Sequence, residues 1–260
     1  MSGATRLDGQ VVTRFDRVDA LRGFAIVWMA LFHFGFDLNH FHLLPTVTNF
    51  HRDPLWTTQR TCIVSLFLFC AGLGQALAMH AAGSQQNPAR FTPQFWRRWA
   101  QVAGCAVLVS LGSAFMFPRS WIHFGVLHGI AVMLILARLL VPLLAPLKGG
   151  LWLAGALALT LPQVLKHAFF NAPGINWLGL GTLKPFTEDW VPVLPWLGVV
   201  LWGLAAGQWL LAHRRSVLQG AVPAPLRPLA TLGRWSLSFY MLHQPVLIGG
   251  ILAGRTLGWW

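Results

Sequence analysis

The sequence predicts an all-α fold, a polytopic transmembrane helix bundle with about seven spanning helices. Composition is the first reason, since 55% of the 260 residues are hydrophobic and only 10% are charged. A soluble domain carries roughly 25% charged residues, so this chain could not cover its surface against water. The mean hydropathy of +0.58 and the fourteen Trp residues agree with this, because tryptophan is enriched where spanning helices meet the lipid–water interface.

Each spanning helix needs about 20 largely apolar residues, and seven runs approach that length. In chain order they are 19–39, 58–81, 97–117, 122–145, 150–168, 191–212 and 233–254. The fifth run is the least regular, because Pro162 interrupts it and Lys166 and His167 follow. We treat residues 1–260 as one integral-membrane domain, in which 1–17 is a cytoplasmic segment and the first apolar run is a retained helix.

The basic residues predict the orientation of these helices. One set of helix ends carries Arg6, Arg14, Arg17, Arg22, Arg90, Arg97, Arg98, Lys148, Arg214, Arg215, Arg227 and Arg234. The opposite ends carry only Arg52, Arg119, Lys166, Lys184 and Arg255. Lys and Arg accumulate in cytoplasmic loops, so we expect a cytoplasmic N-terminus and, with seven spans, an external C-terminus.

This distribution also explains the net charge of +12, which in a soluble protein would suggest nucleic acid. We therefore expect a lipid bilayer and not nucleic acid as partner, and an anionic ligand at the cytoplasmic face is compatible with the same arginines.

The three cysteines lie inside apolar runs without metal-ligand spacing, so we predict neither a metal site nor a disulfide framework. Small-xxx-small spacings at Gly125–Gly129, Gly203–Gly207 and Gly250–Gly254 indicate close helix packing. A homodimer is compatible with the sequence.

Ionisable side chains inside a span are costly and suggest function. The first run carries five polar side chains whose spacing returns to one helix face: Asp19, Arg22, His33, Asp37 and His40. We interpret His33 as a general base and Asp37, one turn later, as the group that orients its ring. The alternative is structural: an Asp19–Arg22 pair and a His33 bonded to a neighbouring helix.

Further candidates lie elsewhere. His128 and His243 lie in the fourth and last runs, and Ser236, Tyr240, His243 and Gln244 share a helix face. His51 lies in the first external loop, and Arg60 opens the second span. We interpret His51 as the second candidate for the base, unless it is simply part of a solvated loop. Hydrogen bonds to a reacting oxyanion or to an acceptor could come from His128, His243, Tyr240 or Arg60, and the histidines could instead be structural. The arginines that flank the spans are topology markers that could also form a phosphate-binding rim, namely Arg22, Arg97, Arg98 and Arg234.

Several motifs carry a resemblance to a known family. Asp19-Ala20-Leu21-Arg22-Gly23, followed by Met29 and His33, resembles the start of the heparan-alpha-glucosaminide N-acetyltransferase-like catalytic domain in its short bacterial form. Further stretches that are similar to that family follow in order: 66–72, 124–128, 192–198, 232–237 and 243–245. The resemblance extends over nearly the whole chain, and the wider kinship is to transmembrane acyltransferases.

The resemblance implies a multi-pass protein of the bacterial inner membrane that moves an acetyl or other acyl group. The donor would be cytoplasmic acyl-CoA, acetyl-CoA in this family, and the acceptor an extracytoplasmic amino sugar or glycan. The lysosomal member uses a histidine beyond its first span, whose counterpart here would be His51. That member has an asparagine near the position of His33, so His33 is a departure from it.

Two other classes of function fit parts of the sequence. A transporter of a small solute would also have polar stripes in its spanning helices and Gly/Pro breaks near the midplane. A haem-binding membrane subunit could use His33, His128 or His243 as axial ligands.

Overall fold

The structure is a computed structural model that describes residues 15–46, 48–50, 52–82 and 91–258, together with the backbone of residues 6–7 and 10–11. The side chains of His51, Arg6, Arg14 and Arg90 therefore lie outside the described residues. In the part described, the regular elements are helices, apart from the short antiparallel pair of β1 (Arg6–Leu7) and β2 (Gln10–Val11). The predicted all-α fold is confirmed in these residues.

Six helices among the described residues are long and apolar enough to cross a membrane. They are α1 (Asp16–His40), α2 (Pro54–Ala81), α3 (Pro93–Met116), α4 (Val126–Leu144), α6 (Val193–His213) and α9 (Ser236–Thr256). The fifth predicted span forms α5 (Gly150–Val164), which at 15 residues is about 22 Å long. A hydrocarbon core is about 30 Å thick, so this helix is shorter than the sequence predicts. It ends at Val164 because Leu165 is extended.

The remaining elements are short: η1 (Ala168–Asn171), η2 (Asn176–Leu178), α7 (Arg215–Leu218), η3 (Ala224–Leu226) and α8 (Arg227–Arg234). Several predicted limits differ from the helix ends by three or four residues, and two of these differences have a visible cause. The last span begins at Ser236 and not at 233, because α8 is a separate helix that ends at Arg234. The fourth begins at Val126 and not at 122, because Phe124 is extended and pairs with Trp190.

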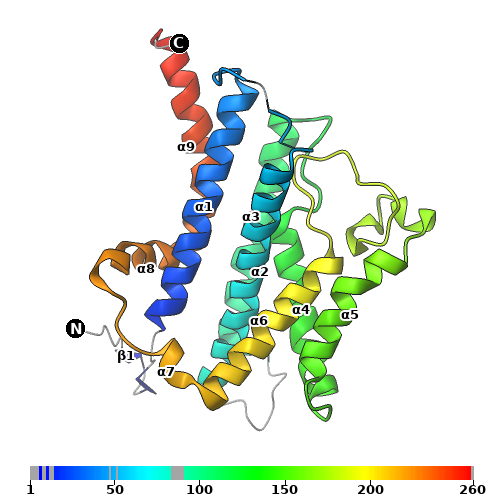
Figure 1. Ribbon diagram of the computed structural model, residues 1–260, viewed down its shortest axis with the longest axis vertical. Coiled ribbons are helices and arrows are strands. Elements are labelled where there is room, and N and C mark those ends of the chain that lie inside the picture. The colour runs from blue at the N-terminus through cyan, green and yellow to red at the C-terminus, as the bar shows by residue number, and fades with distance from the viewer. Residues whose placement is uncertain are drawn as a thin grey trace. The chain divides into compact units, whose positions relative to one another are not determined.

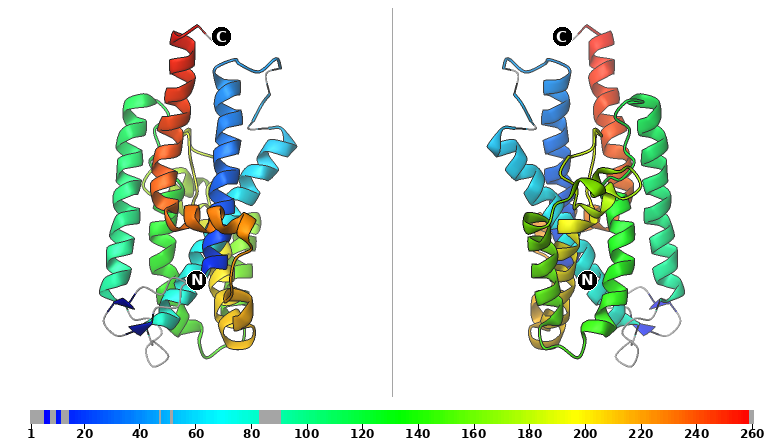
Figure 2. Two further views of the ribbon diagram at one scale, coloured as in Figure 1. Left: turned by 90° about the vertical axis from the view of Figure 1, so that its left-hand side faces the viewer. Right: turned by 90° about the vertical axis from the view of Figure 1, so that its right-hand side faces the viewer.

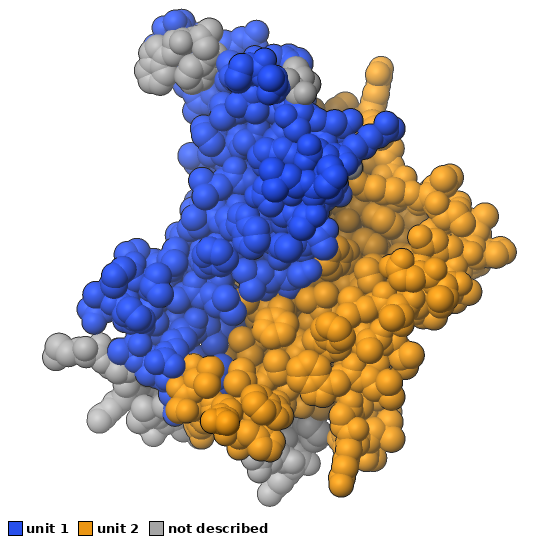
Figure 3. Space-filling model, viewed as in Figure 1, with its two compact units in different colours: residues 1–67, 218–260 blue, residues 68–217 orange. Residues whose placement is uncertain are grey.

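The chain divides into two compact units, coloured separately in Figure 3. Unit 1 contains residues 1–67 and 218–260, and unit 2 contains residues 68–217, so the boundary falls within α2.

In unit 1, α1 and α9 lie side by side and run in the same direction, with α8 crossing α1 (Figures 1 and 2). The crossing is close because glycines remove the side chains that would separate the backbones. A Cβ at Gly23 would meet the carbonyl of Leu229, and a Cβ at Gly233 would meet the carbonyl of Asp19. These contacts hold the beginning of α1 against α8. The contact at Gly233 lies about one helical turn before α9 begins.

In unit 2, consecutive helices are antiparallel. Trp99 of α3 donates its indole N–H to the carbonyl of Ala131 in α4 (2.9 Å), and Trp202 of α6 donates to the carbonyl of Trp152 in α5 (3.0 Å). Gly203 packs on the Phe69 carbonyl, which confirms close packing there, whereas a Cβ at Gly250 in unit 1 would meet nothing within 4 Å. The outer faces of these helices are apolar, as a lipid-facing surface requires: Phe115 is 88% exposed.

Candidate active site

The polar stripe predicted on α1 faces α9 at its far end. Asp37 is buried, with 3% of its surface exposed. Its Oδ1 accepts a hydrogen bond from Nε2 of Gln244 in α9 (2.9 Å). A buried carboxylate needs such a donor, because an unpaired charge in a low-dielectric interior is strongly unfavourable. The two residues are 207 positions apart in the chain, and their bond joins α1 to α9.

One turn earlier, two histidines from the same helices meet. The rings of His33 in α1 and His243 in α9 have centroids 5.1 Å apart and are inclined by 58°. His243 is buried, and the ring of Phe239 stacks on it at 6.2 Å. The His243 ring is therefore held in one orientation beside His33.

The hydrogen bonds of His243 define which of its ring nitrogens carries the proton. Its Nδ1 lies 2.6 Å from the carbonyl oxygen of Tyr240. A carbonyl can only accept, so Nδ1 is the donor, and in the neutral ring the lone pair is on Nε2. That Nε2 is buried and has no partner among the described residues.

Two further acceptor atoms, on Gln244, the next residue of α9, and on its partner Asp37, are in the same situation. Oδ2 of Asp37 and Oε1 of Gln244 are both buried and have no hydrogen-bond partner in the described part of the chain. Because the other atom of each group forms the Asp37–Gln244 bond, both groups are fixed in place. Three buried acceptors thus remain for a ligand, and one of them belongs to a carboxylate. We call Asp37, His243 and Gln244 the acceptor cluster.

The other end of the stripe forms a cluster of ion pairs. Arg22 Nη1 lies 3.1 Å from Asp19 Oδ1, and Arg234 Nη2 lies 2.8 Å from Oδ1 of Asp16. Arg234 Nε also approaches Asp19 Oδ2 at 3.9 Å. Arg22 is 11 residues before His33, or about 16 Å along the axis of α1. The two arginines are partly compensated by these aspartates, so this end of unit 1 is less positive than the arginine count suggests.

The remaining predicted site residues are distributed over both units. The centroid of the Tyr240 ring lies 5.7 Å from that of the His243 ring and 6.4 Å from that of the Phe67 ring. Arg60 lies on α2 in unit 1, and no bond joins it to the described residues of the acceptor cluster. Arg97 and Arg98 are exposed on α3 of unit 2. His51 lies outside the described residues, so its predicted role stays a prediction.

His128, in unit 2, has a structural environment. Its Nδ1 accepts from the backbone N–H of Gly125 (3.3 Å), and its Nε2 lies 3.1 Å from Oγ of Ser110. The Ser110 hydroxyl donates to the carbonyl of Ile122 (2.6 Å), so it accepts from His128. Both ring nitrogens are therefore engaged within the protein. This arrangement favours a structural role over haem ligation or catalysis.

Sequence reasoning missed the pairing of one residue and missed a second residue altogether. Gln244 was placed on the face of His243, but its pairing with Asp37 depends on the fold. Arg138 is buried at 3% exposure in α4, where its Nε donates to Gln75 Oε1 (2.8 Å) and its guanidinium lies over the Phe95 ring. A charged residue within the run 122–145 was the signal that could have identified Arg138. No group of three or more His, Cys, Asp or Glu among the described residues could hold a metal ion.

The fold and this cluster define a multi-pass helical membrane protein with a buried imidazole and carboxylate between two of its helices. The family model for the catalytic domain of heparan-alpha-glucosaminide N-acetyltransferase matches residues 14–245, so the chain belongs to that family, as the sequence motifs indicated. The family is an acetyltransferase catalytic domain that uses acetyl-CoA. Searches of curated proteins and of solved structures found no match.

Proposed function

We propose that this protein transfers an acetyl group from cytoplasmic acetyl-CoA to a primary amine of an extracytoplasmic acceptor, such as an amino sugar, and that the acceptor cluster holds the amine. The observation that supports this most is the set of three buried, unpartnered acceptor atoms on Asp37, His243 and Gln244. A buried polar atom without a partner is unfavourable, so such a set favours a ligand that donates several hydrogen bonds.

An ammonium group fits this demand better than a hydroxyl. An ammonium group has three N–H donors and a positive charge, which match three acceptors and one carboxylate. A hydroxyl has one donor and would leave two of the acceptors unmet. The cluster therefore supports N-acylation over O-acylation.

The reaction requires loss of protons from the bound ammonium. Nε2 of His243 accepts the first proton, which leaves a neutral amine with a free electron pair. The amine nitrogen then attacks the thioester carbonyl carbon, the C–N bond forms, and the C–S bond breaks. The leaving thiolate takes up the second proton as the amide forms. The products are the N-acetylated acceptor, CoA and one proton held by the enzyme.

His33 is the second imidazole at this point and is the base that the sequence predicts. With its ring next to His243, it is placed to receive the proton from His243 or to act directly on the acceptor. Asp37 binds Gln244, so we assign its carboxylate to the charge of the bound amine and not to the orientation of His33.

The donor is expected at the ion-pair end of unit 1. The phosphates of acetyl-CoA suit the forked guanidinium groups of Arg22 and Arg234, whose side chains are 27% and 37% exposed. Their aspartate partners weaken this fit, because the phosphates would have to compete with Asp16 and Asp19. A role for Arg97 and Arg98 stays a prediction from the sequence.

The test compares acceptors and variants. We expect the purified protein to transfer labelled acetyl groups from acetyl-CoA to glucosamine and not to glucose. His243→Gln should lower kcat at least 100-fold, which is the lower range for loss of a general base. The decrease in kcat of His33→Gln measures how much the second imidazole contributes to proton removal.

His213→Gln is the matched control, because His213 lies at the exposed end of α6 and bonds the Trp209 carbonyl. Equal use of glucose and glucosamine would contradict the amine assignment. Parental turnover in a folded His243→Gln protein would contradict its role as the base.

A further inference from the structure

The helix α8 has two faces of different character. Its inner face is small and packs on α1: Ala230 and Gly233 are buried, and a Cβ at Gly233 would meet the Asp19 carbonyl. Figures 1 and 2 show that α8 lies across α1 and does not run along it. The close backbone contacts fix this crossing, so the opposite face of α8 points away from unit 1's helices.

That outer face is basic and aromatic. Arg227, Thr231 and Arg234 are exposed and follow one another at spacings of four and three residues, which places them on one side of the helix. Trp235, directly after α8, continues this side and is 67% exposed. We call these four residues the α8 outer face, of which Arg234 reaches back to α1 through its ion pair with Asp16.

The position of α8 along α1 indicates its environment. It contacts α1 at Asp19 and Gly23, where the apolar run of that span begins. If the bilayer begins where this apolar run begins, a short helix that crosses α1 at this level lies in the plane of the headgroups. Arginine and tryptophan on one side of such a helix are typical of segments that lie in the interface.

The charges on this surface favour one kind of occupant. Arg234 is paired with Asp16. Arg227 forms no ion pair with a described residue, and its bonds are made by its backbone: the N–H donates to the Ala224 carbonyl, and the carbonyl accepts from the Thr231 hydroxyl (3.2 Å). A guanidinium at headgroup depth with an exposed indole two turns away matches a phosphate beside acyl chains.

We propose that the α8 outer face binds the phosphate headgroups of anionic phospholipids, with Arg227 as the cation and Trp235 against the acyl region. This surface is separate from the acceptor cluster but shares Arg234 with the proposed donor site, so the lipid assignment and its test use Arg227.

The experiment counts lipids that remain on the full-length protein. The purified protein in neutral detergent is titrated with phosphatidylglycerol or with phosphatidylcholine, and retained lipids are counted by native mass spectrometry. We expect phosphatidylglycerol to be retained in preference. Arg227→Gln should weaken that preference about fivefold, because one basic residue near an anionic surface contributes about 1 kcal/mol. Arg227→Lys should keep the preference, since it keeps the charge.

Arg255→Gln is the matched control, because Arg255 is exposed at the opposite end of α9 in the same unit. Equal retention of both lipids by the parent would overturn the proposal, and so would equal effects of Arg227→Gln and Arg255→Gln. A third outcome is displacement of phosphatidylglycerol by free CoA in the parent but not in Arg227→Gln. It would assign Arg227 to nucleotide phosphates and would also overturn the lipid assignment.

Discussion

The carboxylate of Asp37 provides the charge that selects an amine in the acceptor cluster. Asp37→Asn keeps the shape and keeps an oxygen for the Gln244 bond, but replaces the free carboxylate oxygen with an N–H₂ donor. We expect KM for glucosamine to rise about tenfold or more, because a hydrogen bond to a charged group contributes about 1.5–3 kcal/mol. The decrease in kcat should be smaller, since His243 is unchanged.

Steady-state kinetics with varied glucosamine would measure this split between KM and kcat. Asp53→Asn is a suitable control, because Asp53 is an acidic residue of unit 1 whose Oδ1 accepts from the Leu55 N–H (2.9 Å) at the beginning of α2. An unchanged KM in Asp37→Asn would remove the carboxylate from amine binding.

His128 is expected to contribute to the stability of the fold and not to the binding of glucosamine. His128→Ala removes the hydrogen bonds to Ser110 and to the Gly125 N–H, and each such bond contributes about 1 kcal/mol. The midpoint of thermal unfolding in detergent should fall, while KM for glucosamine in the remaining folded protein should stay at the parental value. A raised KM at parental stability would instead give His128 a role in binding.

Residue-level predictions from the sequence succeeded where local spacing decides the outcome. His33 and Asp37 are one turn apart on any helix, so their common face was predictable. The unprotonated state of His243 Nε2 depends on the carbonyl of Tyr240, and the partner of Asp37 is Gln244, 207 residues away. Spacing within one helix contains no information about such contacts. The sequence therefore identified the histidines but not which one has a fixed lone pair.

At the scale of the elements, the position of α8 depends on its close backbone contact with α1. Gly233→Ala would place a Cβ against the Asp19 carbonyl, so α8 and α1 would have to separate. We expect a lower midpoint of thermal unfolding than for the parent. Gly249→Ala in α9 is the control, because a Cβ there meets nothing within 4 Å. Equal midpoints for the two variants would show that the α1–α8 crossing tolerates a methyl group.

The elements also show how far hydropathy predicts helix ends. The long apolar runs became α1–α4, α6 and α9 because each must bury its backbone polar groups in internal hydrogen bonds. The helix ends differ from the predicted ones where residues distant in the chain form bonds with them. Asp189 Oδ2 accepts from the backbone N–H of Val126 at 2.8 Å, so a residue 63 positions away caps the beginning of α4. The α8 segment has only eight residues, which is too short for a clear periodic signal.

At the scale of the whole molecule, helix directions bear on the number of membrane crossings. Asp19 of α1 lies against Gly233, just before α9, whereas Asp37 near the end of α1 bonds Gln244 within α9. The first and last spans are therefore parallel. Two parallel spans at the two ends of a chain require an odd number of crossings, and six long helices do not satisfy this. The seventh span that the sequence predicts, α5, would supply the missing crossing, and it stays a prediction.

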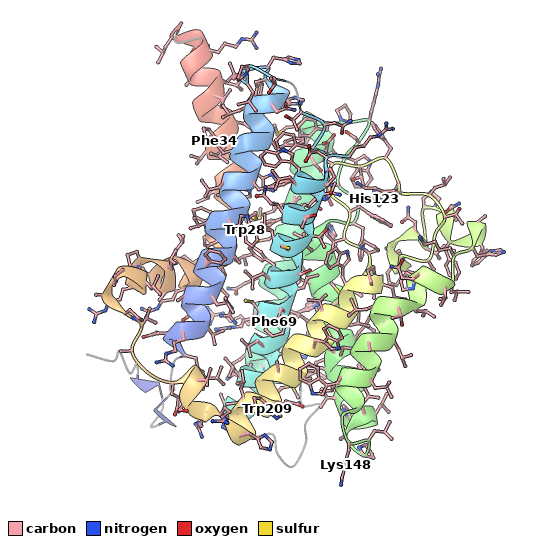
Figure 4. All side chains as sticks on the ribbon, viewed as in Figure 1. Trp28, Phe34, Phe69, His123, Lys148 and Trp209 are labelled. Carbon is pink, nitrogen blue, oxygen red and sulfur yellow. The ribbon has the colours of Figure 1, made fainter. Side chains whose placement is uncertain are left out.

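The arrangement within unit 2 agrees with this prediction. Because α5 is antiparallel to α6 and follows α4 through a tight turn, it connects two helices that run in one direction. Figure 4 shows Lys148, at the α4–α5 turn, and Trp209 of α6 toward one end of unit 2, and His123 toward the other. With the basic end in the cytoplasm, the chain should begin inside and finish outside.

Cysteine labelling tests this topology in the full-length chain. After replacement of Cys62, Cys70 and Cys105 by serine, Leu257→Cys at the end of α9 should react with a membrane-impermeant maleimide in intact spheroplasts. Lys148→Cys should react only after lysis, because the α4–α5 turn is predicted to be cytoplasmic. If both cysteines are labelled only after lysis, the crossings are even in number, α5 does not span, and the parallel arrangement of α1 and α9 requires another explanation.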